Sequence, residues 1–140
     1  MTPYVVDASV AVKWFVPEMH SEAALHFIES DCELFAPDFL VVEVGNILWK
    51  KIRRAELAKN EGREVLRALR RAPMQFYSSE LLVEPAFEIA CTTNRTLYDC
   101  LYLALAVLRR CRAVTADRRL YNALQDSPFT DNVHWIQEVP

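Results

Sequence analysis

Short apolar segments alternate along the chain with stretches of helical periodicity, and this alternation constrains the fold more than any other feature. The segments are rich in β-branched and aromatic residues, which favour strands. They span residues 4–6, 33–36, 74–77, 112–115 and 134–136. Strands separated by helices pair in parallel through right-handed crossovers, which place helices on both faces of the sheet. We therefore predict an α/β fold with a parallel sheet.

Apolar residues at helical spacing predict the connecting helices. We expect these helices over residues 8–15, 21–30, 39–54, 59–71, 81–94, 97–108 and 117–124. Asp38 is placed to cap the third of them. Pro85 suits only a first turn or a kink. The helix after Thr96 has almost no polar face, which predicts that it is buried.

Length and composition narrow the class of protein. With 140 residues, 52% hydrophobic and 25% charged, we expect one soluble domain spanning residues 1–140. No apolar run reaches the roughly 20 residues of a membrane span, and no signal peptide is evident, so we expect a cytoplasmic protein without membrane contact. Four scattered cysteines favour reduced thiols over zinc ligands or disulfides. Only two glycines are present, which excludes glycine-rich phosphate loops.

Charge is segregated along the chain. The total is −3, yet residues 50–71 hold nine basic residues against three acidic ones, a net +6. Arginines in the second half of this segment follow helical spacing and form one stripe. Such a run is often only a solvated face, but it also suits an RNA backbone. The RNA-binding candidates are Lys50, Lys51, Arg63, Arg67 and Arg70.

Four carboxylates are candidates for chemistry. Asp7 and Asp117 each follow a predicted strand and precede a helix, where an aspartate also serves as an ordinary helix cap. Asp99 lies three residues after Thr96, so the two are placed to form a capping box. Glu43 borders the apolar stripe of its helix, which fits either a solvated edge or a cleft.

Taken together, the four are harder to explain as caps. Asp7 and Asp117 end parallel strands, so they share one edge of the sheet. Carboxylates packed close together repel one another, and a divalent cation relieves that repulsion. Oxygen ligands without cysteine or histidine nearby favour Mg²⁺ or Mn²⁺ over zinc. The three histidines are scattered, and we expect surface or structural roles for them.

With these residues in hand, the chain resembles the PIN domain family, and within it the VapC-type toxins of toxin–antitoxin pairs. The resemblance covers the whole chain in order. It rests on the segments 5–9 (VVDAS), 42–46 (VEVGN), 98–104 (YDCLYLA) and 114–117 (VTAD). Cys100 departs from the small residue, such as alanine, that is usual at its position.

The resemblance implies a three-layer α/β/α sandwich with strand order 3-2-1-4-5. It implies a metal-dependent endoribonuclease whose Mg²⁺ or Mn²⁺ ligands and catalytic residues are Asp7, Glu43, Asp99 and Asp117. Ser9 and Thr115 match positions that support the site, and Asn46 matches one that lines it. A VapB-like antitoxin and a homodimer are implied as partners. The alternative is a catalytically silent PIN-like module that only binds RNA or protein.

The aromatic residues give a physical reason to expect a protein partner. Trp14 and Phe15 follow Asp7 closely, while Phe39 and Trp49 share a helix with Glu43. These are more large apolar groups than one small core needs. We expect some of them to line an exposed groove that accepts an amphipathic helix.

Overall fold

A five-stranded parallel sheet forms the centre of the protein in the computed structural model, which describes residues 1–140. The strands are β1 (Thr2–Val6), β2 (Cys32–Pro37), β3 (Gln75–Tyr77), β4 (Arg112–Thr115) and β5 (Val133–Trp135). Their order is β3-β2-β1-β4-β5, and every neighbouring pair is parallel. The predicted parallel α/β fold and its strand order are confirmed.

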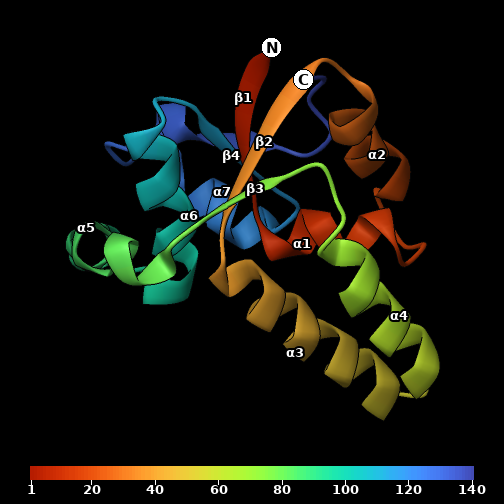
Figure 1. Ribbon diagram of the computed structural model, residues 1–140. Helices are drawn as coiled ribbons and strands as arrows, with labels where there is room; N and C mark the ends of the chain where they lie inside the picture. The colour runs from red at the N-terminus through yellow and green to blue at the C-terminus, as the bar shows by residue number, and fades with distance from the viewer.

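Helices cover both faces of this sheet (Figure 1). α5 and α6 lie on one side, with α6 packed directly against β1, β2 and β4, whereas α2 and α4 lie on the other side. The helices are α1 (Ala8–Ala11), α2 (Ser21–Glu29), α3 (Phe39–Arg53), α4 (Lys59–Leu69), α5 (Ser79–Thr93), α6 (Leu97–Leu108) and α7 (Arg118–Leu124). Short 3₁₀ turns follow α1 and precede β5. None of the helices combines the length and the apolar character needed to cross a membrane.

The first strand lies at the centre of the core. Tyr4 pairs with Leu34 on one side and with Arg112 on the other, and Val6 pairs with Val114. Val5 and Val6 are fully buried, as expected for a strand covered on both faces. The chain passes from β1 to β2 and β3 on one side of the sheet, and it returns to β4 and β5 on the other side of β1. This is the switch point at which open α/β sheets form a crevice beyond their carboxyl ends.

Helices α3 and α4 form a hairpin that projects from the sheet (Figure 1). Gly62 of α4 allows their close approach. A Cβ atom at this position would lie 2.9 Å from Cδ1 of Ile52 on α3, so the end of the Ile52 side chain would have to shift to make room for it. Gly62 therefore lets the Ile52 side chain pack directly against the backbone of α4.

The structure corrects three expectations about the helices. Asp38 makes no capping bond to α3; its carboxylate instead accepts the backbone N–H of Ser79 and fixes the start of α5. Pro85 is the seventh residue of α5, which continues through it, so of the two expected settings the first turn is excluded and the kink stays a prediction. The expected first helix stops at Ala11, where a 3₁₀ turn begins.

The prediction that α6 is buried holds only for its middle. Residues 100–106 are buried, but Tyr98, Val107 and Leu108 are exposed. The helix packs against the three strands β1, β2 and β4, and only its middle is covered completely.

Candidate active site

Two aspartates project from the carboxyl ends of the adjacent central strands. Asp7 follows β1 and its carboxylate accepts the backbone N–H of Val10, capping α1. Asp117 follows β4 and accepts the N–H groups of Arg119 and Leu120, capping α7. Both are thus helix caps, as the simpler interpretation expected. Capping does not exclude a second role, because each carboxylate has a second oxygen.

Ser9 links the two strand ends. Its hydroxyl donates to the Asp7 carboxylate and accepts the backbone N–H of Ala116, 3.0 Å away. Thr115, which is fully buried, accepts the N–H of Asp117 at 3.0 Å. These two hydroxyl residues hold the strand ends, and hence the two aspartates, in fixed relative positions.

Glu43 reaches the same place from α3, where Tyr102 of α6 meets it. The Tyr102 hydroxyl donates a hydrogen bond to the Glu43 carboxylate, and the tyrosine ring is buried. Sequence reasoning assigned no role to Tyr102. A signal was available, because Asp99 and Tyr102 are three residues apart on one helix and so share a face.

Asp99 completes the cluster from the first turn of α6. Its backbone N–H is capped by Thr96, and its carboxylate pairs with Arg95, whose Nη2 lies 3.4 Å from Oδ2. All four acids line one cavity of about 200 Å³. Its other lining residues are Ala8, Ser9, Ile47 and Tyr102. The structure therefore brings together acids from four separate elements.

Burial and the charges of neighbouring acids disfavour ionisation of Asp7, Glu43 and Asp99. Burial raises the pKa of Asp7 to about 7, partly opposed by the Ser9 and Thr115 hydroxyls and reinforced by the charge of Glu43. Burial also raises the pKa of Glu43, with Asp99 adding to the effect and Tyr102 opposing it. The pKa of Asp99 is raised by burial and by Asp117, against the lowering effect of Arg95. Each acid thus senses another, as like charges in one site do.

The donor chemistry of the cavity fits a hard divalent cation. Only oxygen ligands are offered, and neither histidine nor cysteine lines the cavity. As the side chains lie, however, no three of them are placed to hold a metal ion. The reason is local: Asp7, Glu43, Asp99 and Asp117 are each held by a protein partner, namely Ser9, Tyr102, Arg95 and the first amides of α7. An ion would have to compete with those partners.

The other predicted site residues lie outside this cavity. Asn46 is exposed and does not line it, whereas Thr115 lies buried beneath it. Among the basic candidates, Lys50, Arg63, Arg67 and Arg70 are exposed. Lys51 differs, because its ammonium is paired with Glu18, which Lys13 also contacts. That ion pair connects the end of α3 to the turn before α2. The charge of Lys51 is therefore already neutralised by Glu18 rather than free to contact RNA.

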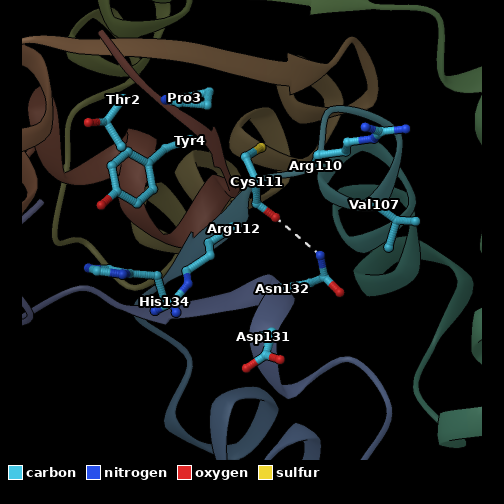
Figure 2. A pocket seen from close by; sticks show the side chains of 10 residues that line it. All are labelled: Thr2, Pro3, Tyr4, Val107, Arg110, Cys111, Arg112, Asp131, Asn132 and His134. Carbon is cyan, nitrogen blue, oxygen red and sulfur yellow. Dashed lines mark hydrogen bonds between the residues drawn. The ribbon is translucent and has the colours of Figure 1, made fainter.

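A larger cavity lies elsewhere, at the amino ends of the central strands (Figure 2). It has a volume of about 560 Å³ and is lined by the starts of β1 and β4, with Arg110, Arg112 and Asp131 among its side chains. His134 also lines it, but this buried ring packs edge-on against Tyr4 and Phe27 and has a structural role. With a single carboxylate, this cavity does not share the chemistry of the acidic site.

A parallel α/β sandwich with carboxylates gathered at its switch point defines the class of protein. The chain matches the PIN domain over residues 4–124 and belongs to the PIN domain family.

Known proteins similar to this chain agree with that assignment. It is 35% identical over 118 residues to a protein of Pyrobaculum aerophilum named Ribonuclease VapC3, covering 83% of this chain and 90% of the relative. Among solved structures, PAE2754 from Pyrobaculum aerophilum superimposes with a TM-score of 0.70 at 20% identity, covering 97% of this chain and 85% of that one. A chain of a toxin–antitoxin complex from Klebsiella pneumoniae superimposes with a TM-score of 0.60 at 13% identity, covering 94% and 95%.

Proposed function

We propose that this protein is a metal-dependent endoribonuclease and the toxin of a VapBC-type toxin–antitoxin pair, with residues 1–140 forming one nuclease domain. The observation that carries the proposal is the single cavity lined by Asp7, Glu43, Asp99 and Asp117. A domain that only bound RNA would have no use for four mutually repelling acids at the switch point of its sheet. The similarity to a protein named a VapC ribonuclease supports the same activity.

The four acids would together hold a Mg²⁺ or Mn²⁺ ion. When bound, such an ion lowers the pKa of a water molecule and offsets the charge that develops on the scissile phosphate. Ser9 fixes the orientation of Asp7, and Tyr102 fixes that of Glu43. No histidine lines the cavity to act as acid or base. We therefore expect hydrolysis that leaves a 5′-phosphate and a 3′-hydroxyl.

Basic side chains on the α3–α4 hairpin would hold the RNA backbone. Lys50 lies seven residues after Glu43 on α3, so the two share a helix face, and Arg63, Arg67 and Arg70 extend the positive charge along α4. Such contacts fix the position of the strand without reading its sequence. Lys51 contributes less, because Glu18 already neutralises it.

RNA cleavage tests the proposed activity. Single-stranded RNA is incubated with the protein in EDTA, Mg²⁺ or Mn²⁺, beside an Asp7→Asn control of matched folding, and the product ends are identified. Cleavage only with the ion and only by the wild type is expected. Products with 2′,3′-cyclic phosphate ends would contradict the mechanism. Uncut RNA that still binds would favour the silent binding module.

An antitoxin would occupy the apolar groove along the α3–α4 hairpin. This groove of about 320 Å³ is floored by Leu48, Ile52 and Leu66, and Trp49 on its wall is 53% exposed. Lys59 and Arg63 stand at its rim. An amphipathic helix with an acidic edge matches this surface in both shape and charge. Trp14 and Phe39 do not line the groove, and Phe15 lines a separate one beside α4.

A second copy of the chain would cover a different apolar surface, near the start of α3. Val42 is 65% exposed, and three residues earlier on the same helix Phe39 stacks on Tyr98 of α6, with ring centroids 5.1 Å apart. An exposed apolar residue beside a stacked aromatic pair is typical of an interaction surface. We place the homodimer interface here.

A further inference from the structure

Arg95 is the one basic side chain paired with any of the four acids. Its Nη2 lies 3.4 Å from Oδ2 of Asp99, whereas no Lys, Arg or His forms an ion pair with Asp7, Glu43 or Asp117. Both partners are partly covered, since 27% of the Arg95 side chain and 23% of the Asp99 side chain are exposed. Solvent screening is therefore incomplete, and the pair matters more than one on an open surface.

The guanidinium is held at one end only. The backbone N–H of Arg95 donates to the Thr93 hydroxyl, but the buried Nε of the guanidinium finds no hydrogen-bond partner. A buried donor without a partner costs free energy, so this position of the side chain is retained because of the charge of Asp99. Once that charge is neutralised in another way, little remains to keep the guanidinium there.

A divalent cation would neutralise the charge of the Asp99 carboxylate. The ion needs the same carboxylate oxygens and repels a guanidinium beside them. We propose that Arg95 is a built-in competitor of the metal for Asp99, pairing with this carboxylate in the metal-free protein and being displaced when the ion binds. This inference rests on the proposed metal site. Arg95 is thus one of the four protein partners that hold the acids of this cavity away from a metal-coordinating arrangement.

Titration with Mn²⁺ alone, followed by calorimetry without RNA, tests the inference. Arg95→Gln should bind Mn²⁺ about threefold to tenfold more tightly than the wild type, and high salt should shrink the difference. Arg95→Lys keeps the charge and should remain close to the wild type. Arg110→Gln removes the same charge from an exposed position beside the cavity at the amino ends of the central strands and should change nothing.

Melting temperatures provide a second measurement. Without metal, Arg95→Gln should melt no higher than the wild type, because Asp99 has lost its counter-charge. Added Mn²⁺ should then raise its melting temperature by more than that of the wild type. Equal or weaker Mn²⁺ binding by Arg95→Gln, with binding by the wild type intact, would overturn the role of Arg95 and leave the proposed function standing. No Mn²⁺ binding by any variant would overturn both.

Discussion

The hydroxyl of Tyr102 donates a hydrogen bond to the carboxylate of Glu43, joining two helices through residues 59 positions apart. This bond favours the ionised form of Glu43 and opposes the effect of burial on its pKa. It is the contact that directs the α3 carboxylate into the cavity formed by the strand ends.

Removing this hydroxyl tests its importance. Tyr102→Phe keeps the ring and should lower the free energy of unfolding by about 1–3 kcal/mol, the usual value for a hydrogen bond to a charged group. The loss should be larger at pH 8 than at pH 4.5, because the raised pKa of Glu43 lets it take up a proton more readily as the pH falls. Urea unfolding in EDTA measures both values. A loss that is the same at the two pH values would indicate that the hydroxyl does not interact with an ionised Glu43.

Asp7 should make the metal-free protein less stable as the pH rises. Its pKa is about 7 in the folded protein and near 3.8 when unperturbed, so the folded state keeps a proton that the unfolded chain releases. Protonated Asp7 makes its full contribution to the free energy of unfolding below about pH 4. This contribution, on the order of 4 kcal/mol, is lost as the pH rises to 7. Asp7→Asn mimics the protonated side chain and should lack this loss.

Urea unfolding of both proteins in EDTA at pH 4.5, 6 and 8 checks this expectation. The difference in the free energy of unfolding should shift in favour of Asp7→Asn as the pH rises. A difference that is constant across the range would contradict a raised pKa of Asp7.

Replacing Arg63, Arg67 and Arg70 with glutamine should weaken RNA binding similarly for all sequences. Each lost phosphate contact should reduce the slope of log affinity against log salt by about 0.7. The fold should tolerate the change, because all three side chains are exposed. Fluorescence anisotropy at several salt concentrations measures the slope. An unchanged slope, equal to that of a control with Arg110→Gln and Arg112→Gln, would show that these three arginines do not contact RNA and only face solvent.

Trp49→Ala should weaken binding of the proposed antitoxin more than it destabilises the fold. A buried interface tryptophan commonly contributes 2 kcal/mol or more, so about a thirtyfold loss of affinity is expected. Phe87→Ala is a suitable control, since Phe87 is similarly exposed but lies on α5. Calorimetry with the purified antitoxin measures both variants. Equal losses in the two would place the antitoxin elsewhere.

Val42→Glu should yield a monomer. Its side chain is already largely exposed, so the charge costs the single chain little but must be desolvated at an interface. Light scattering coupled to size-exclusion chromatography gives the mass in solution. Val139→Glu, on the exposed C-terminal segment, is the matched control. A dimer that persists in Val42→Glu would exclude this surface.

Local sequence patterns were sufficient to predict the fold and the positions of two of the four acids, Asp7 and Asp117. The strands are short runs of β-branched and aromatic residues, and strand order determines which strand ends are neighbours. Asp7 and Asp117 therefore come together for a reason that can be read from residues adjacent to them in sequence.

Contacts of acidic side chains with residues far away in the sequence could not be predicted in the same way. The bonds from Tyr102 to Glu43, from Lys51 to Glu18 and from Ser79 to Asp38 join residues 59, 33 and 41 positions apart. Helix periodicity gives the face on which a side chain lies, but it does not give the rotation of one helix against another. That rotation depends on packing, here including the missing side chain of Gly62.

The adjacency of β1 and β4 also determines when the acidic cluster can form during synthesis. β1 leaves the ribosome well before its neighbour on one side, residues 112–115, has been made. Until then that edge of β1 has no strand to pair with, and Asp117, which completes the cluster, is absent. A nascent chain therefore lacks the complete set of acids until Asp117 has been translated, so the acidic cavity cannot form before β4 has been made.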